Sequence, residues 1–231
     1  MKQEKEPKKK KEDLSFQVTK KGRRMCGMLN FLRIIVIPLF FLIYPFRYYG
    51  NRKVKDGACI YIGNHYRIWD IIYPAATTWE GIHFLSKKSV TSNWFMEFWC
   101  RGCKVISVNR DGNDARAIME SIRCLKNGEK ISIFPEGTRN KTDAQMLPFK
   151  PGASMFAIRT KTPIVPIMQY KKSRPFRVSH ILIGEPFELS EYYDRKLTQE
   201  DYAEADQKLY DLLLKMRSDH EAFLASKRRR R

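Results

Sequence analysis

The sequence predicts an α/β domain, with a mixed and largely parallel sheet flanked by helices and preceded by an N-terminal membrane-associated helical element. From Gly57 onward, short apolar runs alternate with segments of helical periodicity, which is typical of a parallel sheet with crossover helices. The membrane element is expected because 25–49 is the most apolar stretch of the chain. The length of 231 residues suffices for one domain with a sizeable core.

Positive charge is concentrated at the two ends of the chain. Of the net charge of +19, residues 1–24 carry +6 and residues 227–231 carry +5. We expect a basic mobile tail at 1–24, a folded domain over 50–226 and a second basic tail at 227–231. Such tails suit an anionic membrane surface, nucleic acid or an acidic protein, or they are simply solvated. Five scattered cysteines and the lack of a cleavable signal indicate a reduced, cytosol-facing protein.

The apolar segment 25–49 allows three interpretations. Residues 34–46 carry no charge, but as a helix they are only about 20 Å long, short of the ~30 Å hydrocarbon core of a bilayer. An interfacial or re-entrant helical pair is the first expectation, since Pro38 and Pro45 would kink a longer helix. A single transmembrane helix and a buried core helix are the alternatives. The side chains expected at headgroup level are Arg33, Arg47, Tyr48 and Tyr49.

The rest of the chain divides into six strands and five helices. Strands are expected at 58–62, 82–85, 104–108, 130–134, 163–169 and 176–183. Helices are expected at 70–78, 90–101, 113–127, 151–160 and 200–225. Asn113 and Asp114 are suitable N-caps for the third of these helices, and Gly128 is a suitable stop. The apolar stripe of the last helix indicates ordinary core packing.

Two features of the second helix have competing interpretations. Its aromatic cluster indicates core packing first, and membrane contact or the wall of an acyl-chain tunnel second. The pair Cys100 and Cys103 forms a C-x-x-C, which lacks the second pair that a structural zinc site needs and leaves a redox role as the alternative. The aromatic residues are Trp94, Phe95, Phe98 and Trp99.

A histidine and an aspartate follow the first strand of the domain. His65 is the third residue after the apolar run 58–62, at the edge of the sheet where ligands gather in open α/β folds. Asp70 can begin the next helix with its carboxylate turned back to the imidazole. A carboxylate that accepts from one ring nitrogen fixes the tautomer and stabilises the imidazolium, so the spacing suits a general base.

A second polar turn, Phe134-Pro135-Glu136-Gly137-Thr138-Arg139, follows the strand at 130–134. Together, N-H-x4-D at 64–70 and this F-P-E-G-T-R block resemble the glycerolipid acyltransferase family, in particular 1-acyl-glycerol-3-phosphate acyltransferases. Val108-Asn109-Arg110 and Ile164-Val165-Pro166-Ile167 match two further blocks. The resemblance covers about 57–167. Arg67 stands where family members often carry a small hydroxyl residue, which bears on the choice of acceptor.

The resemblance implies transfer of a fatty acyl group from a thioester to the hydroxyl of 1-acyl-glycerol-3-phosphate, with His65 as base and Asp70 orienting it. Direct attack by the acceptor needs no acyl-enzyme, and the sequence has no G-x-S-x-G elbow. Arg110 and Arg139 would bind the acceptor phosphate, and Glu136 would hold an arginine or accept from a glycerol hydroxyl. The residues expected to contact substrate are Asn64, Arg110, Glu136, Gly137, Thr138 and Arg139.

The expected partners are acyl-CoA or acyl carrier protein as donor, a lysophospholipid as acceptor, and an anionic membrane surface at the cytoplasmic face of the cell membrane. No cofactor, metal or nucleic-acid partner is expected. An acyltransferase for another lysophospholipid is the closer alternative. A basic membrane- or nucleic-acid-binding module without turnover is the alternative from another class, and it rests on charge alone.

Overall fold

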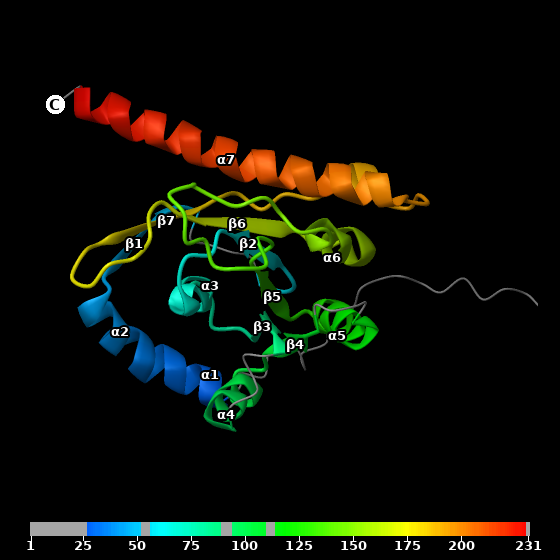
Figure 1. The fold of residues 1–231 in the computed structure, drawn as a ribbon, viewed down its shortest axis with the longest axis horizontal. Helices are drawn as coiled ribbons and strands as arrows, with labels where there is room; N and C mark the ends of the chain where they lie inside the picture. Colours follow the sequence, from blue (N-terminus) through cyan, green and yellow to red (C-terminus); the bar gives the residue numbers. More distant parts are fainter. Residues whose placement is uncertain (1–26, 52–55, 89–93, 110–113, 230–231) are drawn as a thin grey trace, which may run out of the picture.

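The computed structural model describes residues 27–51, 56–88, 94–109 and 114–229. The tail expected at 1–24, and Arg110, lie outside these residues. The centre of the fold is a seven-stranded sheet with the strand order β1-β7-β6-β2-β5-β3-β4 (Figure 1). The strands are β1 (Phe46–Gly50), β2 (Ile60–Gly63), β3 (Ile82–Lys87), β4 (Ile106–Val108), β5 (Lys130–Ile133), β6 (Ile164–Gln169) and β7 (Ser179–Ile183).

The sheet is mixed and mostly parallel, which confirms the predicted fold class. β2 lies between β5 and β6 and is parallel to both, with Ile62 opposite Ile133 on one side and Pro166 on the other. β7 is antiparallel to β6, and β1 is parallel to β7. These two strands therefore run against the direction of the other five. The carboxyl ends of β2, β3, β4, β5 and β6 therefore share one edge with the starts of β7 and β1.

Helices cover both faces of the sheet. Successive side chains of a strand point to opposite faces, and in β2 the side chains on both faces are buried. Ile60 and Ile62 of β2 pack on one face with α5 (Ala115–Lys126), α6 (Ala153–Thr160) and α7 (Gln199–Arg229). Tyr61 packs on the other face with α1 (Gly27–Phe31) and α3 (Ile72–Ala75). Figure 1 shows α7 running along the molecule beside β6 and β7. The helices of the domain are η3 (Ile68–Ile71), α3 (Ile72–Ala75), α4 (Trp94–Gly102), α5 (Ala115–Lys126), α6 (Ala153–Thr160), η5 (Ser190–Tyr192) and α7 (Gln199–Arg229).

The ends of α5 follow the capping signals of the sequence. The side chain of Asp114 accepts a hydrogen bond from the amide of Ala117 at 3.0 Å, as an N-cap residue does. Gly128 has a φ of +78°, and its amide bonds to the carbonyl of Leu125 at 3.0 Å. A left-handed residue at this position ends the helix and allows the chain to enter β5.

The apolar N-terminal segment forms three short helical pieces and an edge strand. The pieces are α1 (Gly27–Phe31), the π-helical η2 (Leu32–Val36) and α2 (Ile37–Ile43). Pro38 lies in the first turn of α2 and has no backbone N–H. A carbonyl in the preceding turn therefore lacks its usual helical hydrogen-bond donor. Residues 46–49, expected to belong to the helical segment, instead form β1 together with Gly50.

Arg33 does not lie at headgroup level as expected. Its side chain is buried and donates to the carbonyls of Ala75, Trp79 and Glu80 at 3.1, 3.2 and 2.7 Å. These carbonyls follow α3, so Arg33 attaches the N-terminal helical segment to the sheet domain. The guanidinium has several donors in a fixed geometry, which allows it to satisfy three acceptors at once.

Several apolar side chains of the N-terminal segment and of α4 face solvent. Leu39 and Leu42 of α2 are 59% and 71% exposed, and Trp94 and Phe98 of α4 are 79% and 58% exposed. Core packing is therefore wrong for these two aromatic residues, whereas the ring of Trp99 lies tilted against that of Phe31 with a centroid distance of 6.3 Å. Among the described residues, no helix has both the length and the apolar character needed to cross a bilayer.

Candidate active site

The candidate site begins where β2 ends at the centre of the sheet. Gly63 leaves no room for a side chain, because an added Cβ would lie 2.0 Å from the carbonyl oxygen of Ile167 on β6. Asn64, the next residue, is buried; its amide nitrogen donates to the carbonyls of Gln145 and Gln169, and its oxygen accepts from the amide of Gln169. These bonds fix the turn that presents His65. Substrate contact by Asn64 stays a prediction.

The structure brings His65 and Asp70 together as the spacing predicts. Nδ1 of His65 lies 3.1 Å from Oδ2 of Asp70. The same oxygen accepts from the backbone amides of Tyr66 and Arg67, both at 2.6 Å. The side chain of Asp70 is 1% exposed and that of His65 is 18% exposed. These contacts hold the carboxylate and orient the ring, so that Nε2 is the nitrogen able to take a proton.

Glu136 supports the histidine turn from the neighbouring strand. Its carboxylate accepts from the backbone amide of His65 at 2.7 Å and from that of Leu147 at 3.0 Å. Burial raises the pKa of Glu136 to about 7, although both amide donors favour the charged form. These bonds join the β2 turn to the chain at 147. The expected roles of holding an arginine or accepting from a glycerol hydroxyl stay predictions.

Phe134, the residue directly after β5, makes a contact with His65 that the sequence did not predict. Its ring stacks on the imidazole of His65 with a centroid distance of 4.4 Å and an angle of 14°. Together with Asp70, this ring fixes the plane of the imidazole from a second direction. The aromatic residue that begins F-P-E-G-T-R was the only signal for this contact.

The turn after Phe134 buries Glu136 but exposes the next polar side chains of the motif. Gly137 has a φ of +64°, and an added Cβ would lie 2.7 Å from Cδ of Lys150, so glycine suits this position on both counts. The side chains of Thr138 and Arg139 are exposed. Arg110, the second arginine expected here, lies outside the described residues, so its distance from Arg139 is not defined. Phosphate binding by both arginines stays a prediction.

The N-terminal helical segment contacts the histidine turn through Trp69. The Trp69 ring lies 4.9 Å from the ring of Tyr44 and 6.2 Å from that of Phe40. Its indole nitrogen donates to Oγ of Ser173 at 2.9 Å, and the guanidinium of Arg67 lies over the ring at 5.5 Å. Apolar surface of α2 therefore begins directly beside the candidate site.

A second titratable cluster lies at the opposite end of β3, which sequence reasoning missed. Ligand atoms of His83, Cys124 and Glu129 lie within 4.8 Å of one another. Nε2 of His83 is 2.7 Å from Glu129, and Nζ of Lys104 is 3.6 Å from the same carboxylate. Burial alone would lower the pKa of His83, but hydrogen bonds to Cys124 and Glu129 outweigh it and raise that pKa to about 9. These contacts describe a buried ion pair.

Comparisons with known proteins identify a family. The model of the family described as "Acyltransferase" matches residues 45–169, more than half of the chain. The 1-acyl-sn-glycerol-3-phosphate acyltransferase of Streptococcus pneumoniae is 30% identical over 154 residues, which cover 64% of this chain and 56% of that protein. The enzyme of the same name from Borreliella burgdorferi is 29% identical over 165 residues, covering 64% and 65%.

A solved structure shares the fold. It is the 1-acyl-sn-glycerophosphate acyltransferase PlsC of Thermotoga maritima, with a TM-score of 0.61 and 20% identity, covering 83% of this chain and 77% of that one. The matches to the two bacterial relatives span just over half and about two thirds of their length. The matched residues include both sequence motifs, the His65–Asp70 pair and the turn after β5. The chain belongs to the acyltransferase family.

Proposed function

We propose that the protein transfers a fatty acyl group from an acyl thioester to the free hydroxyl of 1-acyl-glycerol-3-phosphate, forming phosphatidate. The observation that carries the proposal is the contact of 3.1 Å between His65 Nδ1 and Asp70 Oδ2, at the carboxyl edge of the sheet. The names of the bacterial relatives support this acceptor. A buried carboxylate beside a partly exposed histidine is an arrangement suited to activating a hydroxyl group.

In the proposed reaction, Nε2 of His65 takes the proton of the acceptor hydroxyl as its oxygen attacks the thioester carbonyl carbon. The imidazolium is stabilised by Asp70, whose Oδ2 already accepts from His65. Collapse of the tetrahedral intermediate breaks the carbon–sulfur bond, and the departing sulfur takes the proton back from Nε2. An ester and a free thiol result, and no acyl-enzyme forms.

The phosphate of the acceptor is proposed to bind Arg139, with Arg110 as its partner. Arg139 follows β5, the strand next to β2, and its side chain is exposed. A guanidinium is suited to phosphate because its donors match two phosphate oxygens. The exposed apolar residues of α2 support a further proposal, that the protein works at the cytoplasmic face of the cell membrane, on an acceptor held in the bilayer.

A single assay tests the proposal. The full chain is mixed with an acyl thioester and 1-acyl-glycerol-3-phosphate, and release of free thiol is followed. We expect thiol release to require the acceptor and to be fastest with this acceptor in a panel of lysophospholipids. A faster rate with another lysophospholipid would replace the acceptor and keep the reaction class. The same slow rate with and without any acceptor would favour a binding module without turnover.

A further inference from the structure

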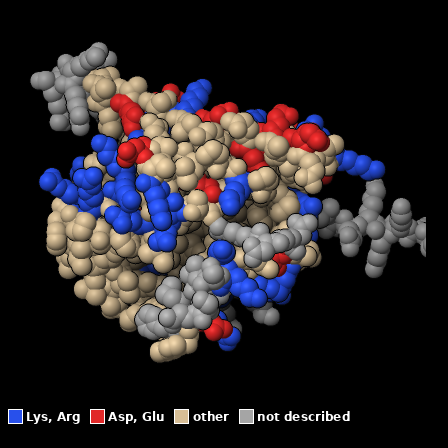
Figure 2. Space-filling view, in the orientation of Figure 1, with Lys and Arg blue, Asp and Glu red and all other residues tan. Residues whose placement is uncertain are grey.

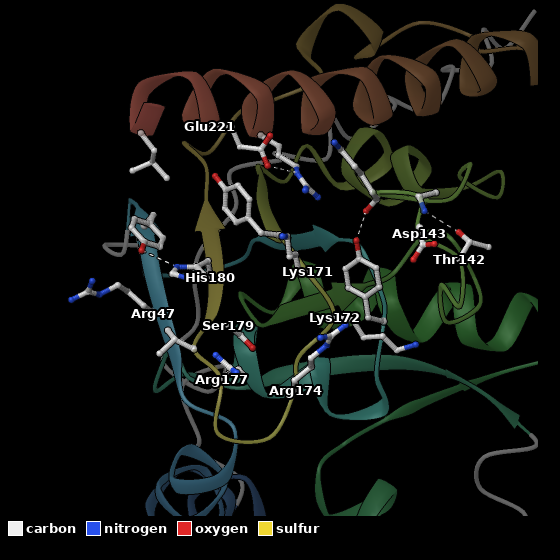
Figure 3. Close-up of a pocket in the computed structure, with 18 of the residues that line it drawn as sticks. Arg47, Thr142, Asp143, Lys171, Lys172, Arg174, Arg177, Ser179, His180 and Glu221 are labelled. Carbon is white, nitrogen blue, oxygen red and sulfur yellow. Dashed lines mark hydrogen bonds and ion pairs between the residues drawn. The ribbon is translucent and has the colours of Figure 1, made fainter. Parts of the chain in front are cut away.

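A strongly basic groove opens beside the candidate active site, on the side of β6 and β7. It has a volume of about 1440 Å³ and is walled by the chain between β6 and β7, the turn at 141–145, β1 and the last turns of α7. Figure 2 shows Lys and Arg side chains gathered on this face, and Figure 3 shows the groove from close by. The exposed basic side chains that line it are Arg47, Lys141, Lys171, Lys172, Arg174 and Arg177.

Arg217 is the buried member of this groove. Its residue is 6% exposed, its Nε lies 3.0 Å from Glu221, and its guanidinium lies 5.2 Å from the Tyr170 ring centre. Its Nη1 is buried and has no hydrogen-bond partner among the residues that the structure describes. Glu221 and Asp143 are the acidic residues that line the groove. The cationic excess and the unsatisfied buried donor together indicate an anionic ligand.

The position of the groove relates it to the reaction. Tyr66, the residue after His65, lines the groove. In the strand order, β6 and β7 lie on one side of β2, whereas β5, which precedes Arg139, lies on the other. The chain that follows Arg139 crosses over to the groove, since Lys141 and Gln145 line it and the carbonyl of Gln145 accepts from the hydroxyl of Tyr66. A site for a second phosphate-bearing substrate must adjoin the histidine turn, because the acceptor hydroxyl oxygen and the thioester carbonyl carbon must meet at one base.

We propose that this groove binds the phosphates of the acyl donor's carrier, a nucleotide-bearing thioester of the coenzyme A type. This inference rests on the proposed function, because it assumes an acyl thioester as substrate. A long, polyphosphorylated carrier fits a groove that is extended, cationic and connected to the histidine turn. A bilayer surface or the convex acidic face of a carrier protein meets the exposed lysines but does not reach the buried Nη1 of Arg217.

The first test measures binding without chemistry. Adenosine 3′,5′-bisphosphate, the phosphorylated nucleotide fragment of the carrier, is titrated into the full chain in neutral detergent at low salt. We expect saturable binding that weakens at least about tenfold in the Lys171→Gln/Lys172→Gln variant and in Arg217→Gln, since each loses charge-assisted bonds to phosphate. The matched control, Arg123→Gln/Lys126→Gln, removes two charges from exposed positions on α5 and should bind as the wild type does.

The second test compares two donors that differ only in the nucleotide. The ratio of kcat/KM for acyl-coenzyme A to kcat/KM for acyl-pantetheine should be high in the wild type. It should fall at least about tenfold in both groove variants and stay high in the α5 control. The ratio separates a carrier contact from damage to the fold, because misfolding lowers both values together.

Three results would overturn the inference. They are failure of the bisphosphate to bind the wild type, equal loss with both donors in the groove variants, and groove-dependent binding of phosphatidylglycerol vesicles in place of the nucleotide, which would assign the groove to lipid headgroups. Groove-dependent nucleotide binding without acyl transfer from any donor would instead refute the proposed function and keep the phosphate site.

Discussion

Oδ2 of Asp70 accepts three hydrogen bonds, one from Nδ1 of His65 at 3.1 Å and two from the backbone amides of Tyr66 and Arg67 at 2.6 Å. One oxygen thus holds both the ring and the turn that carries it. A carboxylate in this position orients the imidazole and stabilises its protonated form. The catalytic proposal and the architecture of the turn therefore depend on the same side chain.

Replacing Asp70 with Asn separates these two roles. An amide oxygen can still accept from the backbone amides, so we expect Asp70→Asn to fold with a Tm close to that of the wild type. Its kcat should fall by ~10²- to 10⁴-fold, because a neutral amide no longer stabilises the imidazolium that forms during the reaction. Thermal denaturation and thiol release measure the two quantities on one sample. A variant that keeps its activity but melts much earlier would identify Asp70 as a structural cap only.

Loss of the exposed guanidinium of Arg139 should affect the acceptor alone. We expect Arg139→Ala to lower kcat/KM for 1-acyl-glycerol-3-phosphate by ~10- to 100-fold, with little change in the KM of the acyl donor. Lysine should rescue only in part, since it provides a point charge without the planar fork. Monoacylglycerol, which lacks the phosphate, is the control acceptor. Equal damage with both acceptors would place the phosphate site elsewhere.

The exposed leucines of α2 are expected to hold the protein on the bilayer. We predict that Leu39→Glu/Leu42→Glu reduces sedimentation of the full chain with anionic vesicles, because it places charge on the inserted surface. Met119→Glu is the matched control, since Met119 is 64% exposed on α5. The wild type should stay bound in high salt, which screens surface charges within ~3 Å at 1 M. Complete release of the wild type by salt would refute an apolar anchor.

The buried pair of His83 and Glu129 predicts a pH-dependent stability. The pKa of His83 is raised to about 9, so the folded state binds a proton that the unfolded state has lost above its ordinary pKa of 6.5. The contribution of His83 to the free energy of unfolding is complete below pH 6.5 and is lost as the pH rises to about 9. The loss amounts to about 3 kcal/mol. We expect Tm to fall over this range in the wild type and much less in His83→Gln. Parallel curves for the two proteins would show that His83 does not titrate in this way.

The sequence predicted the strands of the central sheet because each is a short apolar run between polar turns. β1 escaped prediction because Phe46–Gly50 is a half-exposed edge strand, and its partner β7 is distant in the sequence. The buried position of Arg33 escaped for a related reason, since its three carbonyl partners belong to the chain that follows α3. Contacts made by a segment with remote residues leave no local signal.

The same distinction applies to the candidate site. The His65–Asp70 contact was predictable because both residues belong to one turn. The orientation of the Glu136 side chain was not predictable, because its partners are the backbone amides of His65 and Leu147, which lie in other turns of the chain. The basic groove was also out of reach, since the residues that line it come from 47 to 225 and meet only in the folded chain.

The most direct measurement is the rate of acceptor-dependent thiol release by His65→Ala, compared with the wild type at saturating substrates. If His65 is the base, kcat falls at least ~10²-fold, while the protein keeps its Tm and its binding to vesicles. A folded His65→Ala protein with a kcat near that of the wild type would contradict the account.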